Sequence, residues 1–141
     1  MKASHERPGT GIHELSPTGL APGNGYSHAV SIDPGARLVV ISGQIPLAAD
    51  GTLVGPGDLR AQSRQVFANL EAALTAAGAR WEHVVRLGYF IRDASQVVTV
   101  REVRDETLPA GVRPASTLVE VSRLFRDDLL IEIEALAAVP A

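Results

Sequence analysis

The chain has 141 residues, no cysteine and a formal net charge of -3, with 13 Lys and Arg against 16 Asp and Glu. This length predicts one domain with a substantial core. The acidic balance argues against a nucleic-acid partner, and the lack of cysteine excludes disulfides, thiolate catalysis and Cys-bound zinc. No apolar run approaches the ~20 residues of a membrane span and the N-terminus lacks the apolar core of a signal peptide, so we expect a cytoplasmic protein with no membrane partner.

The first residues differ in composition from the rest of the chain. Residues 1–22 are rich in Pro, Gly, Ser and Thr, and we expect an irregular N-terminal arm ahead of a single domain over residues 23–141. Residues 26–32 and 37–45 are each typical of a strand, and the Asp33-Pro34-Gly35 sequence between them is typical of a turn. The sequence therefore predicts a β-hairpin over residues 26–45.

Two helical patterns follow, each with strands beside it. Apolar residues recur at helical spacing over residues 59–77, with Asp58 placed to cap the helix and Gly78 to end it. A strand over residues 83–92, a helix from its expected cap Ser95 to Thr107, and two strands within residues 113–138 come next. The order ββαβαββ predicts an α+β two-layer sandwich, with both helices on one face of a mostly antiparallel sheet. Several predicted strands have apolar residues at both odd and even positions, which face opposite sides of a sheet. This indicates that the second face of the sheet is buried too, and therefore predicts a homo-oligomer.

The C-terminal strand pattern contains carboxylates. Glu132 stands in an Ile-Glu-Ile-Glu run, where apolar neighbours would lower the local dielectric around a carboxylate that points inward. Such a carboxylate has a raised pKa and is suited to acid/base chemistry. The alternative, which strict alternation favours, is that Glu132 and Glu134 share the solvent face of an edge strand.

Four blocks of sequence, taken in order, resemble the signatures of one family. They are Tyr26-Ser27-His28-Ala29-Val30, then Ile41-Ser42-Gly43-Gln44-Ile45-Pro46, then Tyr89-Phe90-Ile91-Arg92-Asp93, and last Pro114-Ala115 through Val119-Glu120-Val121 to Ile131-Glu132-Ile133-Glu134-Ala135. On these blocks the chain resembles the Rid family, the reactive intermediate deaminases also called YjgF-type proteins. The resemblance implies a chorismate-mutase-like fold and a homotrimeric barrel whose inter-subunit clefts bind a small-molecule ligand. For the active branch it implies hydrolysis of 2-imino acids or their enamine tautomers to 2-keto acids and ammonia, without metal or organic cofactor.

The resemblance also assigns roles to residues. Glu132 matches the catalytic glutamate that moves protons and orients water, Ser42 and Gly43 lie in the block that lines the cleft, and Tyr26 matches a tyrosine at the cleft mouth. Each hydroxyl has a structural alternative. Ser42 can simply fill a tight strand end, and Tyr26 can be a half-buried aromatic residue of a strand.

One position differs from the deaminating members that the chain resembles. Those members carry an arginine after the Pro-Ala pair, which clamps the substrate carboxylate, whereas this chain has Ser116. A neutral hydrogen bond contributes about 1 kcal/mol and a charge-assisted one roughly 1.5–3 kcal/mol, so carboxylate capture should weaken about tenfold or more. We therefore expect a non-standard substrate, bound at a cleft that includes Ser116 and Leu118, which share one strand parity.

Two further residues are candidates for contact with that ligand. Arg101 falls on the second predicted helix, where deaminating relatives tend to carry an asparagine facing the cleft, and its long side chain can reach an anion. The alternative is a solvated helix face with Arg101 paired to Asp105. His28 shares strand parity with Tyr26, so its imidazole can bind an anion or shuttle a proton, or it can be a structural, hydrogen-bonded histidine.

Three functions are compatible with the sequence. The first is a cofactor-free hydrolase of an imine, enamine or related reactive metabolite, and the second is a non-enzymatic protein that binds a small metabolite in the inter-subunit cleft. A ribonuclease, as some relatives have been labelled, is disfavoured by the net charge and the lack of a basic face. We favour the hydrolase.

Overall fold

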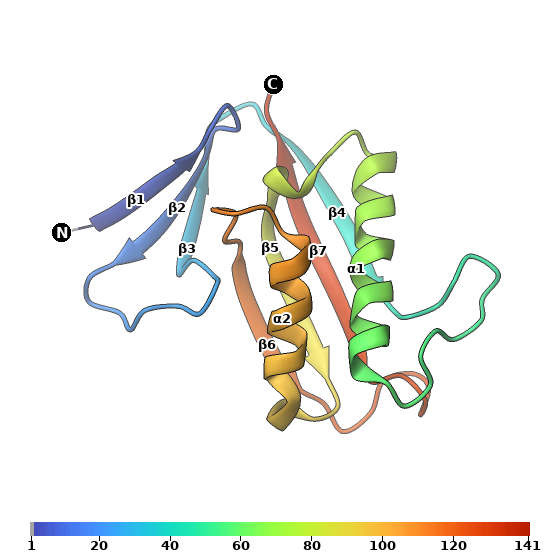
Figure 1. Ribbon diagram of the computed structural model, residues 1–141. Helices are drawn as coiled ribbons and strands as arrows, with labels where there is room; N and C mark the ends of the chain where they lie inside the picture. Colours follow the sequence, from blue (N-terminus) through green and yellow to red (C-terminus); the bar gives the residue numbers. More distant parts are fainter. Residues whose placement is uncertain (1) are drawn as a thin grey trace.

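A computed structural model describes residues 2–141 (Figure 1). Its elements are β1 (Lys2–Arg7), β2 (Ile12–Pro17), β3 (Ala29–Ile32), β4 (Arg37–Gln44), α1 (Leu59–Ala76), β5 (Val84–Ile91), α2 (Val97–Thr107), β6 (Ala115–Glu120) and β7 (Ile131–Val139), with short 3-10 turns at Trp81–His83 and Ala94–Gln96. The described strands form a three-stranded sheet in the order β1-β2-β3 and a four-stranded sheet in the order β4-β7-β5-β6. Only the β5–β6 pair of the larger sheet is parallel, so the expected α+β fold with a mostly antiparallel sheet is confirmed.

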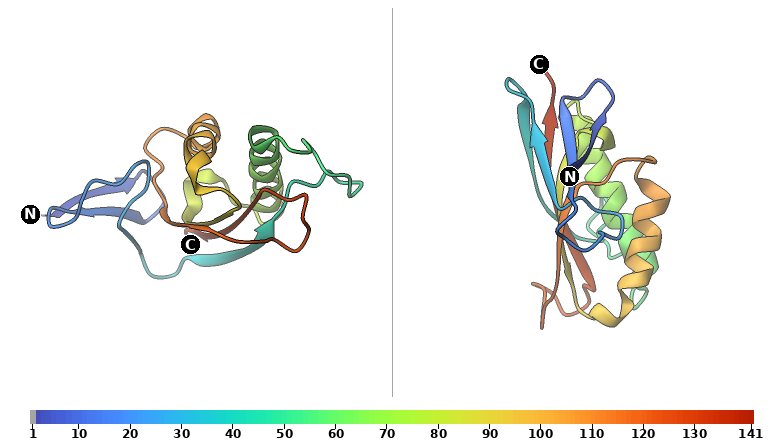
Figure 2. Two further views of the ribbon diagram at one scale, coloured as in Figure 1. Left: turned by 90° about the horizontal axis from the view of Figure 1, so that it is seen from below. Right: turned by 90° about the vertical axis from the view of Figure 1, so that its left-hand side faces the viewer.

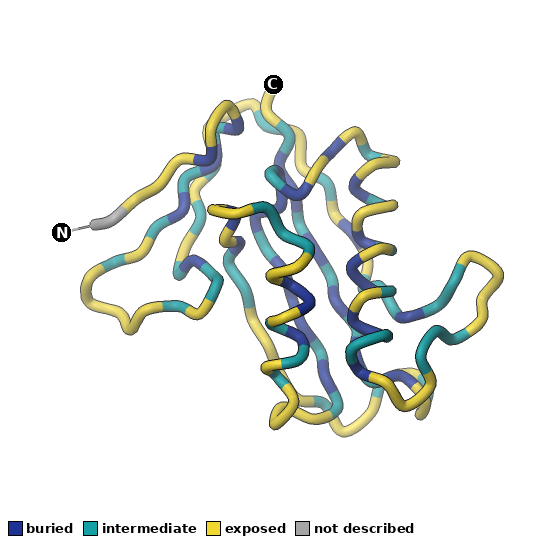
Figure 3. The backbone as a smooth tube through the Cα atoms, viewed as in Figure 1, coloured by how far each residue is buried: buried dark blue, intermediate teal, exposed yellow. Residues whose placement is uncertain are grey.

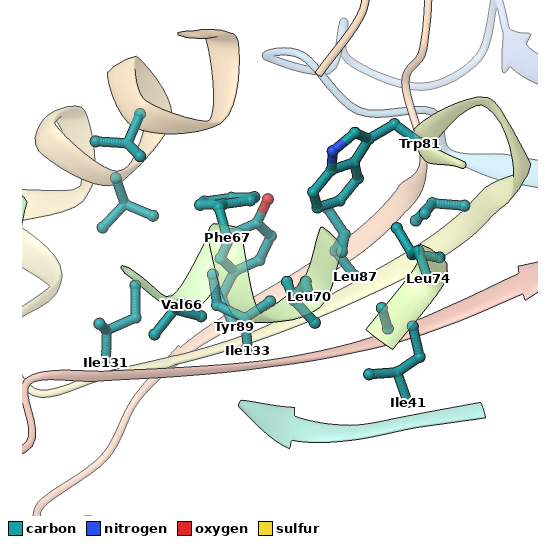
Figure 4. Packing of buried hydrophobic residues seen from close by; sticks show 14 of the residues in the cluster. Ile41, Val66, Phe67, Leu70, Leu74, Trp81, Leu87, Tyr89, Ile131 and Ile133 are labelled. Carbon is teal, nitrogen blue, oxygen red and sulfur yellow. The ribbon is translucent and has the colours of Figure 1, made fainter. Parts of the chain in front are cut away.

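Both helices pack on the same face of the four-stranded sheet, and the three-stranded sheet extends to one side (Figure 2). The core lies between the helices and this sheet, where Phe67 of α1 contacts Trp81 and Tyr89, with ring centroids 5.9 and 6.5 Å away (Figure 4). Asp58 caps α1 as expected, because its carboxylate accepts a hydrogen bond from the Ala61 amide. The helix ends before Gly78, whose φ of 70° suits a residue without a Cβ.

The opposite face of the larger sheet is less covered by this chain, and exposed residues recur along β4 (Figure 3). Leu38 and Val40 of β4 are 58% and 80% exposed there, although both are large and apolar. The two-layer arrangement within one chain thus buries one face of the sheet, and the predicted burial of the second face depends on another subunit.

The expectation of an irregular N-terminal arm is wrong in its secondary structure. β1 and β2 pair in antiparallel register from Lys2↔Pro17 to Arg7↔Ile12, and β2 also pairs with β3. The inward side chains here include Arg7 and Glu14, which are 2% and 5% exposed, so a count of apolar alternation misses both strands. The division of the chain at residue 22 stays a prediction.

The predicted hairpin over residues 26–45 is also wrong. β3 pairs with β2, whereas β4 pairs with β7, so the turn after β3 carries the chain from one sheet to the other. The Asp33 amide donates to the Gly11 carbonyl and its carboxylate lies 2.9 Å from His13 Nε2, which holds this turn to the N-terminal hairpin. Ser95 does not cap α2 either, because it lies in the preceding 3-10 turn, where the Asp93 carboxylate accepts from the Ser95 amide.

Candidate functional site

A cavity of about 190 Å³ lies beneath α2, on the helix side of the larger sheet. Tyr89 of β5 and Ser116 and Leu118 of β6 line its sheet side. Val100, Arg101 and Arg104 line it from α2, while Asn24 and Tyr26 close it from the loop ahead of β3. Four of the residues predicted to bind the ligand are therefore brought together here, namely Tyr26, Arg101, Ser116 and Leu118.

The register of β6 explains why Ser116 and Leu118 reach this cavity. They pair with Leu87 and Tyr89 of β5, which belong to the core beneath the helices. Because side chains alternate between the two faces of a strand, Ser116 and Leu118 face the same way. The Ser116 hydroxyl donates to the Pro114 carbonyl at 3.3 Å, a long hydrogen bond that a ligand can replace.

Arg104 is the most firmly held cation at the cavity. Its side chain is 9% exposed. Nε donates to Asp105 at 2.9 Å, and Nη1 and Nη2 donate to the backbone carbonyl and the side-chain oxygen of Asn24 at 3.0 and 3.5 Å. Gly25 makes room for it, since a Cβ at Gly25 would collide with the guanidinium group. Sequence reasoning missed Arg104, although its position three residues after Arg101 places both on one helix face.

Arg101 has no ion-pair partner, and the Tyr89 hydroxyl has no hydrogen-bond partner, within the described part of the chain. The alternative pairing of Arg101 with Asp105 is not found, because Asp105 binds Arg104 and no residue from 2 to 141 forms an ion pair with Arg101. The Tyr89 hydroxyl is buried without a hydrogen-bond partner among the same residues. Burial raises the pKa of Tyr89 above its usual 10, so the phenol stays protonated.

Glu132 lies on the opposite face of the sheet from this cavity. On β7, Ile131 and Ile133 are buried under the helices, so Glu132 and Glu134 project from the other face, where they are partly covered. The Glu132 carboxylate lies over Gly43 of β4, since a Cβ there would collide with its Oε2. Glu134 lies over Gly88 in the same way and pairs with Arg86 at 3.3 Å.

The environment of Glu132 favours its protonated form. Partial burial raises the pKa of Glu132 above its usual 4.5, and the nearby negative charge of Glu134 raises it further. The two glutamates share one face of β7, as alternation indicates, but β7 lies between β4 and β5, so the alternative of an edge strand is wrong, and Glu132 is partly desolvated. A carboxyl group with a raised pKa can accept a proton and return it, which suits it to acid/base catalysis.

The remaining predicted ligand contacts lie away from the cavity beneath α2. Ser42 and Gly43 lie on β4 beside Glu132, and Ser42 is exposed. His28 Nε2 donates to the Ala21 carbonyl, and the His28 ring stands edge-on to Tyr26 with centroids 5.4 Å apart. This arrangement matches the structural alternative for His28, which supports the loop that carries Tyr26.

The described residues offer no group of three His, Asp or Glu side chains arranged to hold a metal ion. Within residues 2–141, no helix has the length and apolar character needed to cross a membrane.

Comparison with known proteins identifies the family. Residues 17–139 match the family described as Endoribonuclease L-PSP. A Yersinia pestis protein of the conserved Rid family, YyfB, of unknown function, has a crystal structure that superposes with a TM-score of 0.83 at 35% identity, covering 92% of this chain and 99% of that one. The chain therefore belongs to the Rid/YjgF/L-PSP family and has its chorismate-mutase-like fold.

Two curated relatives show the range within the family. Protein DfrA of Myxococcus xanthus is 38% identical over 127 residues, which cover 89% of this chain and 92% of DfrA. The 2-iminobutanoate/2-iminopropanoate deaminase of Escherichia coli K12 is 33% identical over 126 residues, covering 88% of this chain and 92% of that enzyme. Imine deaminases are thus among the relatives of this chain.

Proposed function

We propose that this protein hydrolyses an imine or enamine to a carbonyl compound and ammonia, without a cofactor, with Glu132 as the acid/base. The observation that carries the proposal is the Glu132 carboxyl, desolvated over Gly43 beside Glu134, with a pKa raised by both. The sequence similarity to 2-iminobutanoate/2-iminopropanoate deaminase supports the same reaction class.

The reaction needs two proton transfers that one carboxyl group can perform. Ionised Glu132 accepts a proton from water as the oxygen adds to the carbon of the N-protonated imine (C=NH₂⁺), which gives a neutral tetrahedral amino alcohol. The carboxylic acid then returns a proton to the nitrogen as the C–N bond breaks and ammonia leaves. The hydroxyl proton of the intermediate passes to water as the C=O bond forms, so the protonated imine and water give the ketone, ammonia and a proton.

A complete site of this kind needs two copies of the chain, and we propose the homotrimer that the family resemblance implies. Glu132 and the cavity beneath α2 lie on opposite faces of one sheet, so the cavity of one copy must meet the Glu132 face of another. The exposed Leu38 and Val40 on that face supply an apolar surface for such contact.

The trimer gives a direct prediction. Sedimentation equilibrium should return three times the chain mass of 14.9 kDa, and Val40→Glu should shift the population to monomer because it would bury a charge. The exposed Val98 on α2, outside this face, provides the control, and Val98→Glu should remain trimeric. A monomeric wild type would contradict the trimer.

We further propose that Ser116 stands where deaminating relatives carry the carboxylate-binding arginine, and that the preferred substrate is therefore not a standard small imino acid. Arg101, which has no ion-pair partner among the described residues, is the candidate replacement cation. Tyr26, Ser116 and Leu118 would shape the remainder of the cleft.

The decisive experiment generates 2-imino acids in situ with an amino-acid oxidase and follows trapping of the imine by semicarbazide. Wild type should compete with semicarbazide, most weakly for the imines of small amino acids. Ser116→Arg should raise kcat/KM for those small imines about tenfold or more, because a charged clamp replaces a neutral hydroxyl. If neither wild type nor Ser116→Arg accelerates the loss of any imine, the deaminase proposal is wrong.

One observation favours the second candidate function, a non-enzymatic binding protein. The cationic and hydroxyl groups at the cavity beneath α2 are present within one chain, without a carboxylate acid/base beside them. A protein of this kind would bind a small metabolite and leave it unchanged. Binding without imine turnover would support this alternative.

A further inference from the structure

We propose that a groove at the C-terminal ends of α1 and α2 binds a small organic cation, namely a primary ammonium compound that also carries a neutral hydrogen-bond acceptor. The groove has a volume of about 340 Å³, and Glu71 of α1, Trp81 and Glu82 of the 3-10 turn and Thr107 of α2 are among its lining residues. It shares no lining residue with the cavity beneath α2, and it lies on the helix side of the sheet, away from Glu132. The site therefore goes beyond the proposed function.

The indole of Trp81 is the first indication of a ligand. Trp81 is 6% exposed and its ring packs against Phe67, yet its Nε1 has no hydrogen-bond partner among residues 2–141. Figure 4 shows this nitrogen on the side of the ring that is turned away from Leu87. A buried N–H without an acceptor is unfavourable, and an apolar side chain would pack in the core without that cost. Because an indole nitrogen only donates, a ligand that satisfies it must supply an acceptor.

Two carboxylates provide a second, independent indication, and they favour a cation. Glu71 and Glu82 line the groove from α1 and from the turn before β5, and neither forms an ion pair with any residue from 2 to 141. Arg80 is the one cation among the described residues that line the groove, so negative charge is in excess there. A ligand with a single positive charge would offset that excess.

The ends of both helices add to this preference for a cation. α1 ends at Ala76 and α2 at Thr107, and the C-terminal end of a helix carries partial negative charge on carbonyls that lack an intrahelical partner. Beyond α2, Pro109 has no amide hydrogen, so it cannot donate to the Asp105 carbonyl in the helical pattern. An ammonium group has three N–H donors and can bind carbonyl and carboxylate oxygens together.

These features together define the class of ligand. Its acceptor takes the N–H of Trp81, and its ammonium group lies near the carboxylates of Glu71 and Glu82. Leu74 and Ala79, which are buried and line the groove, supply apolar contacts for the carbon atoms between the two polar ends.

Trp81 also provides the measurement, because it is the single tryptophan of the chain. A proton–nitrogen correlation NMR spectrum of the full chain therefore contains one indole N–H resonance. This resonance should move downfield and reach saturation as ethanolamine, glycinamide or β-alaninamide is added. At least one of these probes should bind about three- to tenfold more tightly than its N-acetyl derivative, which lacks the charge. Propylamine, which has a charge but no acceptor, should move the resonance much less.

Glu71→Gln and Glu82→Gln should each weaken binding of that probe about two- to fivefold. Glu102→Gln is the matched control, since it removes an exposed glutamate of α2 that bridges to Arg60 and does not line the groove, and it should leave the affinity unchanged.

The inference would be overturned by an indole resonance that no probe moves, or by equal binding of the amines and their N-acetyl derivatives. A propylamine shift as large as that of β-alaninamide, or an affinity unchanged in both Glu71→Gln and Glu82→Gln, would overturn it too. None of these measurements requires imine hydrolysis. Saturable binding that depends on both glutamates would therefore support the inference even if the deaminase proposal failed.

Discussion

Glu132→Gln is expected to lower kcat for imine hydrolysis by about 10²- to 10⁴-fold, the range typical of a lost general acid/base. Glutamine has nearly the same shape and can still lie over Gly43, but it cannot take a proton from water. Ligand affinity and trimer mass should therefore change little. The measurement is the semicarbazide competition assay, run beside a binding titration of the same preparation.

The pH dependence of activity provides a second test of Glu132 as the acid/base, with Glu134→Gln as the control. The ionised carboxylate accepts the first proton, so activity should fall as pH decreases through the pKa of Glu132, and this acid limb should lie above the usual 4.5. Glu134→Gln removes a neighbouring negative charge that raises the pKa of Glu132, so it should keep activity and move the acid limb to lower pH. An active Glu132→Gln protein, or an acid limb unmoved by Glu134→Gln, would contradict this role of Glu132.

Glu14→Ala is expected to destabilise the protein by about 3–5 kcal/mol, which is the usual cost of leaving one member of a buried ion pair alone. Arg7 and Glu14 are 2% and 5% exposed and lie 2.7 Å apart, and Glu14 also accepts from the Arg113 amide at 2.6 Å. Arg7 in turn donates to the carbonyls of Glu82 and Val84, so the pair joins the three-stranded sheet to the larger one. Loss of Glu14 leaves a buried guanidinium uncompensated and an amide without its acceptor.

Urea unfolding measures this effect, with two variants for comparison. Arg60→Gln, which breaks an exposed pair with Glu102, should cost at most about 1 kcal/mol. The double variant Arg7→Met/Glu14→Leu removes both charges and should recover part of the stability lost in Glu14→Ala, because no unpaired charge remains, although the Arg113 amide still lacks its acceptor. A loss of under about 1 kcal/mol in Glu14→Ala would mean that this pair does not hold the two sheets together.

The N-terminal hairpin shows where local pattern fails. β1 and β2 bury Arg7 and Glu14 against each other, and only the folded neighbours that satisfy both charges make those positions inward. A sequence alone presents them as solvent-facing polar residues. The hairpin predicted at residues 26–45 was wrong for a related reason. A pattern of Val and Ile indicates a strand but does not specify which other strand it pairs with.

Some residues of the candidate site could be predicted from the sequence, and others could not. The family blocks, with the position of Arg101 on the second predicted helix, predicted one cleft for all the ligand contacts. Tyr26, Arg101, Ser116 and Leu118 lie at one cavity, whereas Glu132 and Gly43 lie together on the other face of the sheet. Their roles in binding stay predictions. Tyr89 and Arg104 were missed because the first is embedded in an apolar strand and the second in a charged helix segment. Their roles depend on a hydroxyl without a partner and on a glycine that makes room for a guanidinium.

Periodicity and capping are local properties of the chain, and they were sufficient to predict the α+β class, both helices with the Asp58 cap, and the run that holds Glu132. The pairing of the strands, and the placement of Glu132 and Ser116 on opposite sides of one sheet, became apparent only in the folded chain. Strand register joins residues far apart in sequence, so it depends on packing across the whole domain.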